Sequence, residues 1–200
     1  EEDTTAVDVP AVIEDCLARL PDDYNMVKIM ERCKPLLKET EGPYSLLLVQ
    51  ELTRMNTLLS YMRKSLSDLQ KGLNGELNMS EAMDDLRQAL SIDQVPGRNP
   101  FHKTSWESRA WWSKKPLPAW YMEMEQRNIQ LKNWVGTLAL PTCMWFSGLF
   151  NPMAFLTAVM QVTGRRQGYP LDQMTCESHV AMITDKDKAD YYPADGAFVH

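Results

Sequence analysis

The strongest pattern along the chain is a stripe of apolar residues that recurs every three or four positions in its first half. The stripe consists of Leu48, Leu52, Met55, Leu59, Met62, Leu66, Leu69 and Leu73. Because polar residues fill most positions between its members, the spacing predicts one amphipathic helix over residues 44–73, roughly 45 Å long at 1.5 Å per residue. Such a helix must cover its apolar face, either against a neighbouring helical layer or along the seam of a coiled coil of two chains.

Weaker patterns of the same kind predict shorter helices on both sides of this segment. Residues 9–20 and 22–30 are expected to form two short helices separated by Pro21. Ser80 is a typical helix-capping residue, and the Val-Pro-Gly turn at 95–97 ends the helix that Ser80 begins. The first half of the chain is therefore predicted to be helical.

A longer helix is predicted between Pro118 and Leu140. Its inward face is apolar and aromatic, and consists of Leu117, Trp120, Tyr121, Met124, Leu131, Trp134 and Val135. Its charged residues are expected to face outward, and they are Glu123, Glu125, Arg127 and Lys132. The pattern is typical of a helix that packs on one side only.

An uncharged run over residues 145–161 joins an aromatic segment to another helix. Asn151 can cap the first free N–H groups, and Pro152 fits the first helical position, where its missing donor has no cost. Phe155 lies on the apolar face of this helix. We expect a strand or buried turn that leads into a short packed helix.

The last part of the chain favours strands. Residues 174–183 alternate between two faces, and residues 197–200 begin a second strand. One or two strands do not make a stable sheet alone, so we expect the natural chain to continue beyond His200. The first residues, Glu1-Glu2-Asp3, resemble neither a signal peptide nor a natural start, which also indicates a fragment.

The charge of the chain argues against two classes of partner. Its net charge is −6 at pH 7, with a pI near 5.1, and no basic stripe is present. Nucleic acid is therefore not an expected partner. No apolar run reaches the roughly 20 residues that a membrane span needs, so we also expect no membrane.

Residues 97–118 mix cations with aromatic side chains and follow no regular period. Such interleaving could bind single-stranded nucleic acid by stacking, but the net negative charge argues against this. We favour an extended arm that tryptophans hold against a larger body. Its cationic and aromatic residues are Arg98, His102, Lys103, Trp106, Arg109, Trp111, Trp112, Lys114 and Lys115.

No motif in the sequence predicts catalysis. The cysteines are too widely spaced for a zinc site, and they are Cys16, Cys33, Cys143 and Cys176. The sequence contains neither a G-x-x-x-x-G-K-[ST] phosphate loop nor a G-x-S-x-G elbow. The glycines of residues 164–168 instead indicate the end of a helix. We assign no catalytic, cofactor-binding or metal-binding residue.

Several phrases of the sequence resemble, in the same order, the C-terminal region of dynein heavy chains. Residues 145–161 are similar to the family phrase W-x-S/T-G-x-F-N-P-x-x-F-L-T-A-x-M-Q. The other similar phrases lie at 50–58, 65–80, 93–96, 127–134, 169–174 and 194–200. The resemblance covers about Tyr44 to His200 and is greatest to β-type heavy chains of the axonemal outer arm. Asn74 stands where the family usually has Lys, Gly164 where it usually has Ala, and residues 97–112 depart from its pattern.

The resemblance implies a mainly α fold. A layer of long amphipathic helices would be followed by the first strands of an incomplete small β-barrel, which makes the full domain α+β. Residues 1–42 would form the end of the sixth AAA+ module or a connector. Residues 43–168 would be the helical part of the C-terminal domain, and residues 169–200 would begin the truncated barrel.

The resemblance also implies a function. Dynein heavy chains are minus-end-directed microtubule motors that drive ciliary and flagellar beating, and this piece would dock on the AAA+ ring and modulate its ATP-driven cycle. The fragment itself would be no enzyme and hold no cofactor, whereas the parent chain would hydrolyse ATP with Mg²⁺. Expected partners are the rest of its own heavy chain, other dynein heavy, intermediate and light chains, and, through the parent chain, microtubules. The expected location is the cytoplasm and cytoskeleton, in the axoneme of a cilium or flagellum.

The apolar stripe and two aromatic residues are the expected docking surface. They are Leu48, Leu52, Met55, Leu59, Met62, Leu66, Leu69, Trp145 and Phe155. The alternative function is that of a free-standing helical adaptor or coiled-coil scaffold, in which the stripe would be the seam between two chains.

Overall fold

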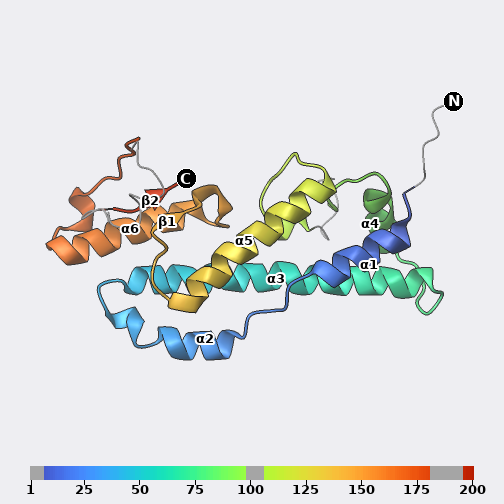
Figure 1. Cartoon of the computed structure of the whole chain (residues 1–200), viewed down its shortest axis with the longest axis horizontal. Coiled ribbons are helices and arrows are strands. Elements are labelled where there is room, and N and C mark those ends of the chain that lie inside the picture. The colour runs from blue at the N-terminus through green and yellow to red at the C-terminus, as the bar shows by residue number, and fades with distance from the viewer. Residues whose placement is uncertain (1–6, 98–105, 181–195) are drawn as a thin grey trace. The chain divides into compact units, whose positions relative to one another are not determined.

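The computed structural model describes residues 7–97, 106–180 and 196–200, and these are mainly helical (Figure 1). The helices are α1 (Val9–Arg19), α2 (Met26–Cys33), α3 (Gly42–Leu73), α4 (Glu81–Ser91), α5 (Leu117–Thr137) and α6 (Pro152–Gln167). This part also contains two short strands, β1 (Cys143–Met144) and β2 (Phe198–Val199), and four short 3₁₀ turns. The helices that the apolar spacing predicts are confirmed, except that the helix expected over residues 22–30 begins only at Met26 and runs to Cys33.

The chain divides into two compact units. Unit 1 takes in Glu1–Asp23 and Arg54–Gln126, and unit 2 takes in Tyr24–Thr53 and Arg127–His200. The long helices α3 and α5 therefore contribute residues to both units.

The ends of three helices follow from the residues found there. The Ser80 hydroxyl accepts a hydrogen bond from the Met83 N–H (3.3 Å), and the Asn151 side chain accepts one from the Ala154 N–H (3.2 Å). At the end of α3, Gly75 has a φ of 77°, and the Glu76 N–H donates to the Lys71 carbonyl (2.9 Å). This left-handed glycine and its hydrogen bond satisfy carbonyls that the helix leaves free.

Unit 1 has an aromatic core. The rings of Trp106 and Trp111 both stack on Trp120, with centroids 6.0 and 5.1 Å away. Trp106 and Trp120 are fully buried, and the Trp106 indole N–H donates to the Ser65 hydroxyl of α3 (3.0 Å). The prediction that tryptophans hold the segment before α5 is therefore confirmed for Trp106 and Trp111, whereas Trp112 is 75% exposed. The remainder of the predicted arm, residues 98–105, lies outside the described residues.

Unit 2 contains a small sheet. β1 pairs with β2 in parallel, with Cys143 opposite Phe198 and Met144 opposite Val199. The prediction of a strand at residues 197–200 is confirmed. The prediction of a strand over 174–183 is wrong for residues 174–180, which are irregular and mostly exposed. Alternation shows which side chains could share a face, but a strand also needs a hydrogen-bonded neighbour. Residues 181–183 are not among those described.

No barrel is present in the described part of the molecule, whose sheet has two strands. The segment before α6, expected to be a strand or buried turn, begins with β1 and continues as a short 3₁₀ turn (Phe146–Gly148). The segment from Trp145 through this turn to Asn151 is called the 145–151 loop. This loop contains the first part of the family-like phrase at residues 145–161.

Candidate functional site

The apolar stripe forms part of the interior of the molecule. Leu48, Leu52, Met55, Leu59, Met62, Leu66 and Leu69 each have 0% of their surface exposed, whereas Leu73 at the end of the helix is 39% exposed. The first two lie in unit 2 and the others in unit 1. These side chains are buried within the single chain, and their predicted docking role stays a prediction.

A buried carboxylate holds the end of the 145–151 loop. Glu51 of α3 is 1% exposed, and its two oxygens accept hydrogen bonds from the N–H groups of Phe150 (2.6 Å) and Asn151 (2.9 Å). These groups lie at the start of α6, where the helix dipole favours a negative charge. Hydrogen bonds to a charged acceptor are stronger than neutral ones. Glu51 thus fixes where α6 begins.

Arg127 of α5 contacts the same loop from another direction. Its guanidinium donates to the Leu149 carbonyl at 3.5 Å and lies 5.0 Å from the centre of the Trp145 ring. The prediction that Arg127 faces outward is wrong, because only 2% of it is exposed. The loop supplies a carbonyl and an aromatic face, and these two groups allow a cation to be buried here.

Gln130, one turn further along α5, contacts the backbone of Trp145. Its side-chain oxygen accepts from the Trp145 N–H (2.8 Å), and its side-chain nitrogen donates to the Trp145 carbonyl (3.2 Å). Together with Glu51 and Arg127, Gln130 forms a set of contacts that we call the loop clamp. The clamp satisfies backbone groups that an irregular segment would otherwise leave without partners.

The two predicted aromatic residues have different environments. Phe155 of α6 is 1% exposed and packs near Tyr44 and Phe146, with ring centroids 6.4 and 6.0 Å away. Trp145 is only half-buried. Among the nine predicted docking residues, Trp145 alone keeps a substantial share of its surface accessible.

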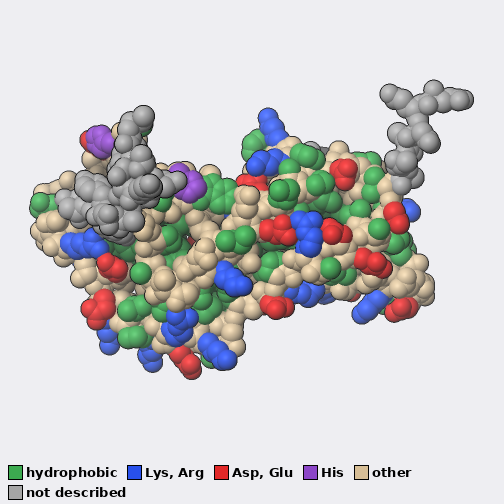
Figure 2. Space-filling view, viewed as in Figure 1, with side chains coloured by type: hydrophobic (Ala, Val, Ile, Leu, Met, Phe, Trp, Pro, Cys, Tyr) green, Lys and Arg blue, Asp and Glu red, His purple; other side chains and the backbone are tan. Residues whose placement is uncertain are grey.

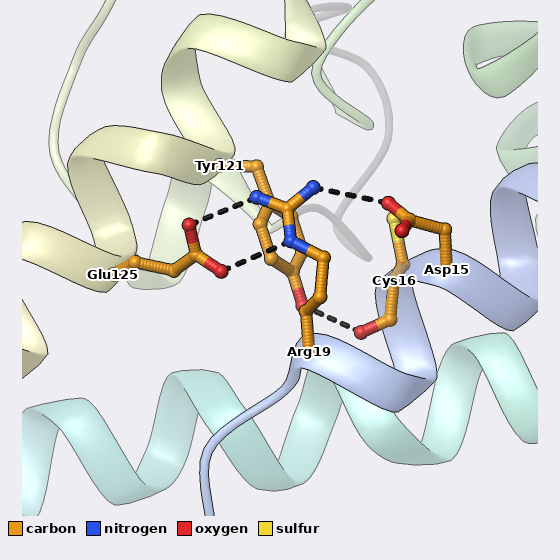
Figure 3. A network of polar contacts seen from close by, with 5 residues as sticks. All are labelled: Asp15, Cys16, Arg19, Tyr121 and Glu125. Atoms are coloured by element: carbon orange, nitrogen blue, oxygen red, sulfur yellow. Dashed lines mark hydrogen bonds and ion pairs between the residues drawn. The ribbon is translucent and has the colours of Figure 1, made fainter.

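A second polar network ties α1 to α5 within unit 1, and Figure 3 shows its members. The Arg19 guanidinium donates to both oxygens of Glu125 (3.1 and 2.8 Å) and to Asp15 (3.0 Å). It also lies 4.9 Å from the centre of the Tyr121 ring, and the Tyr121 hydroxyl donates to the Cys16 carbonyl (2.6 Å). We call this set the Arg19 network.

Three groups of the Arg19 network, those of Cys16, Tyr121 and Arg19, have a raised pKa. Burial, with a smaller contribution from Asp15, raises the pKa of the Cys16 thiol to about 11. Burial also raises the pKa of the Tyr121 hydroxyl, and the hydrogen bond to Glu125 raises the pKa of Arg19. A protonated thiol is a poor nucleophile, so these residues have the properties of a structural tie.

The end of α6 is held as the sequence predicts for a helix C-terminus. Gly168 has a φ of 73°, and its N–H donates to the Gly164 carbonyl. Arg165 donates to the Glu39 carbonyl, and Arg166 forms an ion pair with Glu41. The cations of this segment are therefore engaged with acidic residues and carbonyls of unit 2.

The described residues contain no group of three or more His, Cys, Asp or Glu side chains that could hold a metal ion. The same residues include no helix long and apolar enough to cross a membrane. A cavity of about 500 Å³ lies between α3 and α4, with Asp68, Asp85 and Trp106 in its lining. We assign this cavity no ligand. On the face shown in Figure 2, acidic and basic side chains are interspersed.

Sequence reasoning did not identify the residues of the loop clamp. Glu51 and Arg127 both fall inside family-like phrases, at residues 50–58 and 127–134, and the shared order of those phrases could have marked them. Gln130 also lies within 127–134 but at a position that the phrase leaves variable. The spacing of residues along the sequence does not predict these contacts, because Glu51 binds Phe150 and Asn151, which lie 99 and 100 positions away.

Known proteins resemble this sequence over its whole length. The family model for the C-terminal domain of the dynein heavy chain matches residues 1–200. A ciliary dynein beta chain of Heliocidaris crassispina is 39% identical over 194 residues, covering 96% of this chain and 4% of that protein. Dynein axonemal heavy chain 17 of Mus musculus is 39% identical over 198 residues, covering 98% and 4%. A flagellar outer-arm dynein beta chain of Chlamydomonas reinhardtii is 38% identical over 191 residues, covering 94% and 4%.

These relatives are named as ciliary, axonemal and flagellar dyneins, and the resemblance to β-type heavy chains is confirmed. The chain spans about 4% of the length of the relatives that it matches. It belongs to the family of C-terminal domains of dynein heavy chains.

Proposed function

We propose that this chain is the C-terminal module of a ciliary or flagellar dynein heavy chain, which docks on the AAA+ ring of its own heavy chain and modulates the ATP-driven cycle. The observation that carries the proposal is the family match over residues 1–200, together with relatives named as axonemal dyneins. The parent chain is a minus-end-directed microtubule motor that binds ATP and Mg²⁺. Its other partners are dynein heavy, intermediate and light chains, in the axoneme.

The proposal keeps the division of the chain inferred from the resemblance. Residues 1–42 end the sixth AAA+ module or connect to it, residues 43–168 form the helical part, and residues 169–200 begin the barrel. Because the apolar stripe is buried, docking falls to side chains at the surface. Val27 of α2 and Met153 of α6 are 70% and 68% exposed, the highest values for large apolar residues on the described helices. Exposed apolar side chains of this kind are candidate contacts.

The test uses the full heavy chain with Val27→Lys or Met153→Lys. Both side chains are exposed, so each substitution should change the unfolding free energy of the isolated 200-residue chain by less than about 0.5 kcal/mol. If these residues contact the ring, at least one variant should change the microtubule-stimulated ATPase rate of the motor severalfold.

Val180→Lys is the matched control, since Val180 is 95% exposed in an irregular segment. A heavy chain that lacks residues 1–200 shows the ATPase rate when the contribution of the whole module is lost. An unchanged ATPase rate in this truncated motor would refute the modulatory role. A changed rate there, with normal rates in both point variants, would move the docking contact away from α2 and the start of α6.

The alternative function, a free-standing adaptor or coiled-coil scaffold, has no support from the structure. Its seam would be the stripe of α3, and seven of the eight stripe residues are fully buried in the single chain.

A further inference from the structure

The two-stranded sheet of unit 2 directs alternate backbone groups of β1 to opposite sides. The His200 N–H donates to the Met144 carbonyl (3.0 Å), and the Phe146 N–H donates to the His200 carbonyl (3.0 Å). Met144 and Phe146 therefore face β2. Because successive residues of a strand alternate, the N–H and C=O of Trp145 between them face away from β2. Trp145 directly follows β1, so these groups lie on the outer side of the chain where the β1 edge ends.

Gln130 occupies that outer side. Its side-chain oxygen lies 2.8 Å from the Trp145 nitrogen, and its side-chain nitrogen lies 3.2 Å from the Trp145 oxygen. A carboxamide presents an acceptor and a donor in one plane, as a peptide group does. The paired contacts also fix its orientation, because the reversed amide would set donor against donor and acceptor against acceptor.

We propose that Gln130 is an edge-closing residue. Its side chain takes the place of a neighbouring strand on β1 and prevents a second copy of this chain from pairing there. Exposed strand edges invite pairing between chains, and proteins protect them with side chains or covering elements. The opposite edge differs, since Val199 of β2 directs its backbone groups away from β1 and is 46% exposed.

A narrower role for Gln130 would be to satisfy two backbone groups of the loop and nothing more. The two roles differ in what happens when the carboxamide is removed. If Gln130 only satisfies the two backbone groups of Trp145, a variant without the carboxamide should remain a monomer whose loop is locally less stable. Edge closure predicts that Trp145 finds a new partner, which is the Trp145 edge of another molecule.

The experiment compares Gln130→Met with the original 200-residue chain. Met has a similar length and no group that can replace both hydrogen bonds. At low protein concentration the Trp145 amide should exchange with solvent roughly tenfold faster, the effect of losing about one hydrogen bond. At high concentration the variant should form dimers in light scattering, and exchange at Trp145 should slow again as the edges pair.

Gln126→Met is the matched control, because Gln126 is an exposed glutamine one turn earlier on α5. It should remain monomeric with unchanged exchange at Trp145. If Gln130→Met fails to unfold cooperatively, Gln130→Asn is measured in its place, since its shorter side chain cannot reach Trp145 in the same position. Fast exchange in a variant that stays monomeric at every concentration would overturn edge closure, and so would unchanged exchange at Trp145. Neither readout depends on the AAA+ ring, so failure here leaves the proposed docking function intact.

Discussion

Unit 1 and unit 2 use polar side chains in different ways. In unit 1 the ion pairs of the Arg19 network lie near the surface, where the side chains of Arg19 and Asp15 are 40% and 60% exposed. In unit 2 the loop clamp relies on Glu51 and Arg127, which are 1% and 2% exposed. The depth of burial of these groups is the main difference between the two units.

The difference follows from the backbone that each set of residues supports. Helices α1 and α5 satisfy most of their own N–H and C=O groups, so side chains between them add little that the apolar core does not already provide. The 145–151 loop cannot do so, and buried side chains must pair with its backbone. In unit 2 polar side chains, two of them buried and ionisable and one a half-buried amide, thus support the irregular backbone.

The largest expected effect comes from placing a charge in the core of unit 1, and it tests whether Leu59 is buried in solution. Leu59→Asp should abolish cooperative folding, because it loses roughly 2–5 kcal/mol of packing and buries a carboxylate at a further cost of several kcal/mol. Helical content followed during urea denaturation measures the effect. Gln50→Asp, at an exposed site on the same helix, should shift the midpoint little. A Leu59→Asp variant with a normal midpoint would show that this part of α3 is not core in solution.

The second test removes the buried charge of unit 2. Glu51→Ala should lower the unfolding free energy by about 3 kcal/mol, since two hydrogen bonds to a charged acceptor are lost. Amide exchange should accelerate first at Phe150 and Asn151, whose N–H groups bind Glu51. Gln50→Ala next to it is the control and should be nearly neutral. If Glu51→Ala cost no more than that control, buried charge would not be what holds the loop.

The third test addresses the Arg19 network and should give a smaller effect. Arg19→Ala should cost about 1 kcal/mol, because exposed ion pairs are screened by solvent. The cost should shrink as NaCl is added, in contrast to the cost of Glu51→Ala. A double-mutant cycle of Arg19→Ala and Glu125→Ala measures the pair directly, and Arg54→Ala on the exposed side of α3 controls for general charge. A coupling above about 3 kcal/mol, typical of buried pairs, would remove the contrast between the units.

The smallest expected effect is at Gly164, in the last turn of α6. A Cβ there would lie 3.1 Å from the Tyr169 carbonyl oxygen and 3.2 Å from the Leu171 side chain. Gly164→Ala gains roughly 0.5–1 kcal/mol of helix propensity and loses a similar amount to this crowding, so the net change should stay within about 0.5 kcal/mol. Thermal unfolding measures it, with Gly136→Ala as the control because nothing lies within 4 Å of its added Cβ. A large loss at Gly164 would show that residues 169–171 cannot shift.

Helices and their ends could be predicted because the signals are local. Ser80, Asn151 and Gly168 each act within a few residues of their own position. The spacing of the α3 stripe also predicts a buried face, but it cannot say whether the covering surface belongs to the same chain. Here it does, and the docking role inferred for Leu59 and its neighbours remains without support.

The loop clamp could not be predicted from spacing, and the reason is physical. The chemistry of Glu51 and Arg127 indicates exposure until their partners are known, and those partners are backbone groups of a loop distant in sequence. The strand prediction over 174–180 failed for the complementary reason, since alternation appeared without a neighbouring strand. Whether a polar group has a hydrogen-bond partner depends on two positions at once, and the residue type at one position does not reveal the other.

The contact between Gln130 and Trp145 joins groups that carry no formal charge. Neither group gains or loses a proton in the ordinary working range, and dissolved ions screen the attraction between them only weakly. The contact between Gln130 and Trp145 should therefore persist at salt concentrations that already weaken the ion pair between Arg19 and Glu125. Where the salt concentration changes, this uncharged contact is expected to be the more durable of the two.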